Sequence, residues 1–311
     1  MNVVAAFFVL GAVARLLKTD IDFPKSLYQS LTLFLLVAIG LKGGVALSEH
    51  ANPALAPQAL AIVMLGLLLP IIAFPLLSHI GQLTRDDAAP IAAHYGSVSV
   101  GTYAVAVAML ESQGIAYEAY FPLFVVLLEM PAIAVGLALA RRNDGGVNRK
   151  ELLHEVFCNQ GVVLMSGALV IGYLAGESVA PIMPLFGGLF QGVLALFLLE
   201  MGMVAAARLP DLKRMAPFIS AFGVAMPLVG AALGGGVALL LGFSAGGVAL
   251  LAALGGSASY IAVPAVMRSA LPEANHGLSI AASLGVTFPF NVLVGIPLYI
   301  AGASWLTTTV S

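Results

Sequence analysis

The sequence predicts an all-α integral membrane protein, with ten transmembrane helices arranged as two inverted repeats of five. Of the 311 residues, 60% are hydrophobic and only 9% are charged, whereas a soluble domain carries roughly 25% charged residues. Apolar runs of about 20 residues, the length that crosses a bilayer as a helix, recur along the whole chain. The two halves of the chain also resemble each other in sequence.

Apolar runs, separated by short polar segments, define the ten predicted helices. The first contains Arg15 and has no basic segment before it, so we predict a membrane helix rather than a cleaved signal. In chain order, the predicted spans lie at about 2–17, 27–47, 56–79, 88–111, 118–140, 155–175, 185–207, 215–241, 247–268 and 277–304.

The basic residues support this helix count and give an orientation. Of the 13 lysines and arginines, all except Lys42 lie in or beside the loops that follow odd-numbered spans. These are Arg15, Lys18 and Lys25, then Arg85, then Arg141, Arg142, Arg149 and Lys150, then Arg208, Lys213 and Arg214, and finally Arg268. By the positive-inside rule the odd loops are cytoplasmic, and both termini are predicted to lie outside.

Three pairs of segments recur in the same order at nearly one offset. The stretch "IGLKGGVAL" from Ile39 parallels "LLEMGMVAA" from Leu198, and "GSVSVGT" from Gly96 parallels "GSASYIA" from Gly256. "EMPAIAVG" from Glu129 parallels "TFPFNVLVG". We therefore predict a first repeat at 1–143, a cytoplasmic linker at 144–151 and a second repeat at 152–311. Five helices is an odd number, so the second repeat is inverted, as is typical of secondary transporters.

The paired segments "GSVSVGT" and "GSASYIAVP" interrupt two of the predicted helices. Glycine loosens a helix, and Pro264 cannot donate a backbone hydrogen bond. Freed backbone groups and half-helix N-termini attract anions, while carbonyl and hydroxyl oxygens can hold Na⁺. We predict a substrate site at Gly96, Ser97, Ser99, Thr102, Ser257 and Ser259, with Na⁺ near Ser99 and Ser259. The alternative is that these small residues only let helices pack closely.

Three ionisable residues lie inside predicted helices, where such groups usually face a cavity or a partner. Lys42 and Glu200 occupy equivalent positions in the two repeats, which suggests a mutual ion pair, a coupling-ion role or snorkelling of each side chain to an interface. Glu129 precedes Pro131 and is either a cation or proton site or a satisfied packing residue. Of the histidines, only His94 adjoins an interrupted segment.

These motifs resemble the cyanobacterial-type sodium-dependent bicarbonate transporter family. The resemblance covers nearly the whole chain and rests on motifs in the family's order. They are "IGLKGG" from Ile39, Gly96 to Ala119, Glu129 with Pro131, "MGM" from Met201, "GSASYIAVPAVMRSALPEANHG" from Gly256, and "IPL" from Ile296.

The resemblance implies ten helices in a 5+5 inverted repeat, with gate and core domains and two crossing broken helices that bind bicarbonate beside Na⁺. It further implies a homotrimer in the bacterial inner membrane and a PII-like regulatory partner. Four features differ from the cyanobacterial proteins, in which a threonine stands at the position of Lys42 and an apolar residue at that of Glu200. Those proteins carry an aspartate that aligns with Tyr260, and their linker is longer than 144–151. Tyr260 is therefore an ion-coupling candidate together with Glu129, Ser257, Lys42 and Glu200.

We accordingly predict a secondary active transporter that imports bicarbonate with Na⁺ by alternating access. A carrier of the same architecture for another small anion, or one coupled to H⁺, is an alternative, and a passive anion channel is another. Metalloprotease, P-loop and serine-hydrolase motifs are absent from the sequence, so no enzymatic activity is expected. No cofactor is expected besides the coupling ion, and the partners are the lipid bilayer and small ions rather than nucleic acid.

Overall fold

A computed structural model describes residues 3–19, 21–50, 53–140, 158, 160–208 and 217–310, and every regular element in these ranges is helical. Among these residues, seven helical stretches are long and apolar enough to cross a membrane. They are Lys25–His50, Leu55–Ile80, Pro122–Ala140, Gln160–Val179, Phe190–Ala207, Pro217–Leu240 and His276–Thr309. Val3–Leu16 and Ala245–Gly255 are shorter apolar helices. The predicted linker at 144–151 lies outside the described residues.

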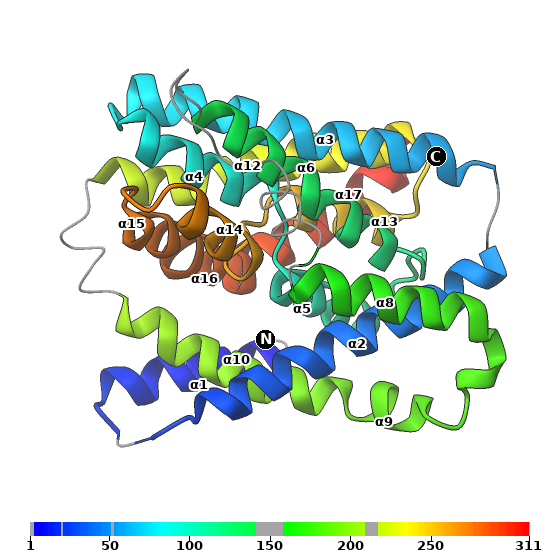
Figure 1. The fold of residues 1–311 in the computed structure, drawn as a ribbon. Helices are drawn as coiled ribbons and strands as arrows, with labels where there is room; N and C mark the ends of the chain where they lie inside the picture. Colours follow the sequence, from blue (N-terminus) through cyan, green and yellow to red (C-terminus); the bar gives the residue numbers. More distant parts are fainter. Residues whose placement is uncertain are drawn as a thin grey trace.

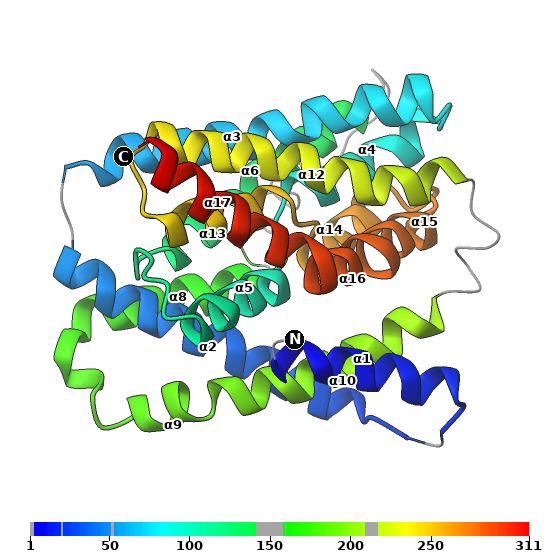
Figure 2. The same ribbon diagram turned by 180° about the vertical axis from the view of Figure 1, so that it is seen from behind.

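The helices form two layers, which Figures 1 and 2 show from opposite sides. We call the smaller one the four-helix layer: α1 (Val3–Leu16), α2 (Lys25–His50), α8 (Gln160–Ala175) and α10 (Phe190–Ala207), with the short α9 (Met183–Gly188) at its edge. Within it, α1 packs along α10 and α2 packs along α8. Each close pair therefore joins one helix from the first half of the chain to one from the second.

The remaining helices form the larger layer. Its long helices are α3 (Leu55–Pro75), α6 (Pro122–Ala140), α12 (Pro217–Leu240) and α17 (Ile296–Val310). Shorter helices lie among them: α4 (Arg85–Gly96), α5 (Val100–Ser112), α13 (Ala245–Gly255), α14 (Ala262–Ala270), α15 (His276–Ile280) and α16 (Phe288–Phe290). The π-helices η1 (Leu76–Ile80), η3 (Ala281–Thr287) and η4 (Asn291–Gly295) continue or join several of these helices.

Glycines allow the paired helices of the four-helix layer to approach closely. A methyl group at Gly202 of α10 would collide with the backbone of Phe8 in α1, and one at Gly44 of α2 would collide with the backbone of Leu169 in α8. In a bilayer, small residues let helix backbones come together and gain dispersion contacts where lipid offers no hydrophobic driving force. This explains the glycines in "IGLKGG" and "MGM" as packing residues.

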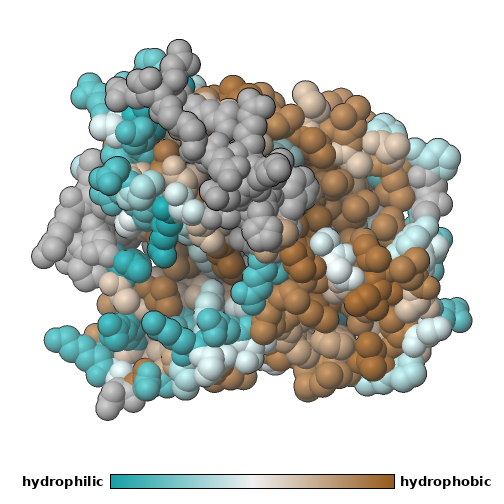
Figure 3. Space-filling model, in the orientation of Figure 1, coloured by the Kyte–Doolittle hydropathy of each residue, from teal (hydrophilic) through white to brown (hydrophobic). Residues whose placement is uncertain are grey.

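The molecular surface agrees with a protein that crosses a membrane. In Figure 3 hydrophobic residues cover a broad region over the centre and right of the molecule, and hydrophilic residues gather toward its edges, above all the left edge. Large apolar side chains such as Leu174 (77% exposed), Leu240 (89%) and Trp305 (66%) point outward. Such exposure is expected where the surroundings are lipid rather than water.

The structure divides three of the predicted spans. The span 88–111 consists of α4 and α5, the span 247–268 consists of α13 and α14, and the span 185–207 consists of α9 and α10. In the span 277–304, π-helical turns alternate with α-helical ones. The physical reason is local: glycine and serine disrupt the helices at Gly96–Ser99 and Gly256–Ser259, and Pro289 removes a backbone donor between η3 and η4.

Candidate functional site

The first break in the larger layer separates α4 from α5. Helix α4 ends at Gly96, and Ser99 has extended backbone immediately before α5 begins at Val100. The Ser99 hydroxyl accepts a hydrogen bond from the backbone N–H of Thr102 at 3.1 Å, which makes Ser99 the N-cap of α5. Serine is among the preferred N-caps because its short side chain satisfies a free N–H group of the first turn.

The second break separates α13 from α14. Helix α13 ends at Gly255, and α14 begins at Ala262 with Pro264 in its first turn, where no intrahelical donor is needed. The Ser257 hydroxyl donates to the carbonyl oxygen of Leu254 at 2.8 Å. Asn291 holds this break from the other side, since its amide donates to the carbonyl oxygen of Gly256 at 2.7 Å.

Three hydrogen bonds connect the two breaks directly. The backbone N–H of Ser99 donates to the Ser257 hydroxyl at 3.1 Å. The backbone N–H of Ser259 donates to the carbonyl oxygen of His94 at 2.8 Å, and the His94 ring nitrogen Nδ1 lies 2.5 Å from the carbonyl oxygen of Ser259. The interrupted segments of the two halves therefore form one bonded unit within the membrane.

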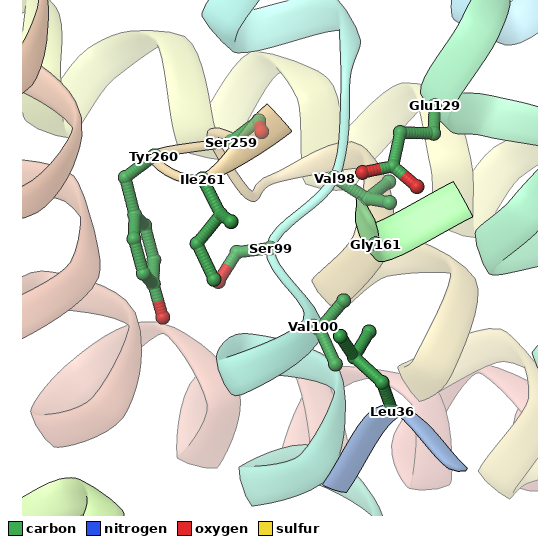
Figure 4. A pocket seen from close by; sticks show the side chains of 9 residues that line it. All are labelled: Leu36, Val98, Ser99, Val100, Glu129, Gly161, Ser259, Tyr260 and Ile261. Carbon is green, nitrogen blue, oxygen red and sulfur yellow. The ribbon is translucent and has the colours of Figure 1, made fainter. Parts of the chain in front are cut away.

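A small cavity lies beside this unit, between the two layers (Figure 4). Helices α2 and α8 of the four-helix layer contribute Leu36 and Gly161 to its wall, and α6 contributes Glu129. The two breaks and their flanks supply the rest of the lining: Val98, Ser99, Val100, Ser259, Tyr260 and Ile261. The cavity volume is about 10 Å³, which is about enough for one water molecule.

Several polar atoms in and around the cavity are buried without a hydrogen-bond partner among the described residues. They are the hydroxyls of Ser97, Thr102 and Tyr260, the Oε2 atom of Glu129 and the Nε2 atom of His94. Glu129 is only 3% exposed. An unsatisfied buried polar group costs free energy, and a buried charge costs more. A site with this many unpaired groups is suited to a polar or ionic ligand.

The structure brings some of the predicted site residues to the cavity and leaves others around it. Ser99, Ser259, Tyr260 and Glu129 line the cavity. Ser97, Thr102 and Ser257 are buried nearby but do not line it. Gly96 serves packing, because a methyl group there would lie 2.8 Å from the Ala132 side chain and would collide with Pro70.

The ion pair, one of three interpretations of Lys42 and Glu200, is wrong: both residues are described, and they form no such pair. The ammonium group of Lys42 instead lies 4.9 Å from the centre of the Phe190 ring, a cation–π contact. Glu200 lines a separate cavity of about 230 Å³ together with Arg15. Helices α2 and α10 run in opposite directions (Figures 1 and 2), so two residues in their second halves lie toward opposite ends of the layer.

Sequence reasoning missed a second polar network in the larger layer. The Thr287 hydroxyl donates to the carbonyl oxygen of Gly223 at 2.7 Å, and it lies 2.8 Å from the Tyr95 hydroxyl. Asn291 also accepts a hydrogen bond from the Tyr299 hydroxyl at 3.0 Å. A threonine and an asparagine inside an otherwise apolar run were the available signal.

Comparison with known proteins identifies the family. A search of curated proteins gives no match. The family model for the Na⁺-dependent bicarbonate transporter superfamily matches residues 3–304, nearly the whole chain. This match confirms the resemblance seen in the sequence, and the superfamily consists of transporters rather than enzymes. The multi-pass helical membrane protein described above therefore belongs to the Na⁺-dependent bicarbonate transporter superfamily.

Proposed function

We propose that this transporter is a secondary active symporter that imports bicarbonate together with Na⁺ by alternating access. The observation that carries the proposal is the junction of the two breaks. Hydroxyls from both halves of the chain and an unpartnered carboxyl group line one cavity between the two helical layers. Secondary transporters bind substrate and coupling ion in such discontinuous helices, where two repeats meet.

The proposed architecture is ten spans in two inverted repeats, 1–143 and 152–311. In this repeat, α1, α2, α3 and α4 of the first half correspond to α8, α10, α12 and α13 of the second half. The packing supports this correspondence: α1 packs on α10 as α8 packs on α2, and α3 contacts α4 as α12 contacts α13. In this proposal the four-helix layer is the gate domain and the larger layer is the core domain. Both termini face outward, the protein lies in the bacterial inner membrane, and three copies form a trimer.

The bicarbonate site is proposed at the N-terminal end of α5. The first N–H groups of a helix and its dipole favour a negative charge. The hydroxyls of Ser99, Ser259 and Tyr260 are available there to donate to the oxygen atoms of bicarbonate. Ser97, Thr102 and Ser257 surround these groups, and Gly96 lets the end of α4 approach its neighbours.

Na⁺ is proposed near Ser99 and Ser259, with Glu129 as the source of negative charge. A hard cation prefers oxygen ligands, and the chain has Tyr260 in place of the acid of the cyanobacterial proteins. Glu129 lines the same cavity and makes no hydrogen bond within the described residues. Lys42 and Glu200 lie outside this cavity, which favours Glu129 over them as the coupling group. Protonation of Glu129 in place of Na⁺ binding is the H⁺-coupled alternative.

The size of the cavity supports alternating access. A volume of about 10 Å³ holds about one water molecule, whereas bicarbonate has four heavy atoms. Binding therefore requires the two layers to move apart on one side. At the end of α5 that carries Glu111, the layers are joined by the hydrogen bond from Gln191 of α10 to Glu111 at 3.2 Å. Sliding of the larger layer past the four-helix layer would open the site to each side in turn.

Uptake of labelled bicarbonate into proteoliposomes tests the proposal. An inward Na⁺ gradient is applied or omitted at fixed pH and membrane potential. Uphill uptake that requires the Na⁺ gradient supports symport, and uptake driven only by a pH gradient supports the H⁺-coupled alternative. Equilibration without accumulation would favour the passive channel, and no uptake under any gradient would reject bicarbonate as the substrate. A PII-like regulator, proposed from the resemblance, is tested separately by adding such a protein to the cytoplasmic side.

A further inference from the structure

We infer that His94 is a positioning residue for the anion site, because its backbone and its side chain together fix the segment that carries Ser259. The inference deepens the proposed function and rests on it. His94 belongs to the last turn of α4 and does not line the cavity. It acts through Ser259, which does.

The contact between His94 and Ser259 has two points. The carbonyl oxygen of His94 accepts from the backbone N–H of Ser259 at 2.8 Å, and the ring nitrogen Nδ1 lies 2.5 Å from the carbonyl oxygen of Ser259. Both bonds use only the backbone of Ser259. Two bonds to the N–H and the C=O of one residue restrict its translation and its rotation at once.

This arrangement leaves the Ser259 hydroxyl available to a ligand. That hydroxyl makes no hydrogen bond with the described residues, and Ser259 is 2% exposed. The residues between Gly256 and Ile261 have no helical hydrogen bonds to hold them except those of their flanks. Loss of the His94 side chain therefore leaves one buried carbonyl group without this hydrogen bond and lets the segment that carries the Ser259 hydroxyl shift.

The hydrogen bond to Ser259 determines which nitrogen of the His94 ring carries the hydrogen. A carbonyl oxygen only accepts, so Nδ1 carries the hydrogen, and Nε2 is the atom without a partner. An asparagine places its amide nitrogen close to the position of Nδ1, whereas a glutamine places its amide nitrogen close to that of Nε2. If only the hydrogen bond from the Nδ1 position matters, asparagine at position 94 should function and glutamine should not. If any polar side chain suffices, both should function.

The neighbouring residue provides a matched control. Tyr95 follows His94 in α4, is 1% exposed, and its hydroxyl pairs with that of Thr287 at 2.8 Å. Tyr95→Phe thus removes one buried hydrogen bond from the same helix turn. Its partner belongs to η3, so the bond does not hold the second break.

The experiment uses the full-length protein with three variants of His94 and the control. In proteoliposomes, His94→Ala and His94→Gln are expected to raise the half-saturating bicarbonate concentration about tenfold, the effect of losing one buried hydrogen bond of about 1.4 kcal/mol. His94→Asn and Tyr95→Phe are expected to stay within about twofold of wild type. Hydrogen exchange of peptides covering 256–261, measured in detergent, is expected to rise in the first two variants only.

The outcomes distinguish an error in the role of His94 from an error in the proposed substrate. Unchanged half-saturation and unchanged exchange in His94→Ala would overturn the role of His94, and so would His94→Asn behaving like His94→Ala. Failure of the wild-type protein to take up bicarbonate would reject the proposed substrate. Because the exchange measurement does not depend on the substrate, that failure is distinguishable from the failure of His94 to hold the break.

Discussion

The backbone N–H of Ser99 donates a hydrogen bond to the hydroxyl of Ser257 at 3.1 Å, across 158 residues of sequence. The same hydroxyl donates to the carbonyl oxygen of Leu254 at 2.8 Å. Ser257 thus uses both its donor and an acceptor within the protein. Ser259, two residues on, lines the cavity, and its hydroxyl makes no hydrogen bond with the described residues. The two serines are therefore expected to respond differently to mutation.

Ser257→Ala is expected to lower stability. The substitution leaves the buried N–H of Ser99 without a partner, which costs about 1–3 kcal/mol. Ser259→Ala is the matched control, because it removes a hydroxyl that makes no hydrogen bond with the described residues. Thermal unfolding in detergent should show a lower midpoint for Ser257→Ala and little change for Ser259→Ala. Equal losses in both variants would contradict the structural role of Ser257.

Glu129→Gln is expected to weaken the dependence of uptake on Na⁺ without lowering stability. Glu129 is 3% exposed and its Oε2 atom has no hydrogen-bond partner among the described residues, so the neutral isostere removes an unfavourable buried group rather than a favourable contact. If the carboxylate balances the charge of Na⁺, the half-saturating Na⁺ concentration should rise at least about tenfold, which corresponds to 1.4 kcal/mol.

Glu200→Gln is the control for Glu129, since Glu200 is an acid within a helix of the four-helix layer and lines a different cavity. Its Na⁺ dependence is expected to match that of wild type. The assignment of Glu129 would be rejected if Glu200→Gln shifted the half-saturating Na⁺ concentration and Glu129→Gln did not.

The effects of Gly101→Ala and Tyr260→Phe on stability are expected to be strongly non-additive. A methyl group at Gly101 would lie 2.5 Å from the Tyr260 hydroxyl and 3.0 Å from Cε1 of Phe197. The Tyr260 ring packs edge-on against Phe288, with ring centres 5.3 Å apart, and is not free to move aside. Gly101→Ala alone should therefore destabilise the protein.

The double variant tests whether the phenolic oxygen is the cause. Tyr260→Phe removes the atom nearest to the new methyl group, so adding it to Gly101→Ala should restore part of the lost stability. A double-mutant cycle on unfolding midpoints should give a coupling of about 0.5–3 kcal/mol. Additive effects would contradict the contact between these two positions.

The two breaks could be predicted because their cause is local. Glycine and hydroxylated residues at Gly96–Ser99 and Gly256–Ser259 stand out in an apolar chain, and the structure has non-helical backbone at both. The partners of Thr287 and Asn291 could not be predicted, because they lie on other elements that are far away in the sequence. Hydrophobic periodicity carries no information about such distant partners.

The absence of an ion pair between Lys42 and Glu200 shows that sequence similarity between repeats does not establish which residues are in contact. Equivalent positions suggest proximity, yet sequence similarity between the repeats gives equivalence rather than contact. Because α2 and α10 run in opposite directions, Lys42 meets Phe190 near the start of α10, and Glu200 lies near Arg15 of α1. His94 illustrates the reverse case, since its position beside the break was evident but its partner, Ser259, became visible only in the fold.

Gly202→Ala is expected to disrupt the four-helix layer. A methyl group at this position would collide with the carbonyl oxygen of Phe8, a backbone atom that cannot turn aside, so α1 and α10 would have to separate. Gly236→Ala in α12 is the control, because the added methyl group would meet no atom of another described element within 4 Å. Alanine at an unobstructed helical position should even stabilise the helix by about 0.5–1 kcal/mol. Unfolding in detergent should therefore give a lower midpoint for Gly202→Ala and an equal or higher one for Gly236→Ala. A wild-type midpoint in Gly202→Ala would mean that α1 and α10 are not held at backbone contact, and the four-helix layer would then lack the rigid packing that the proposed alternating access requires.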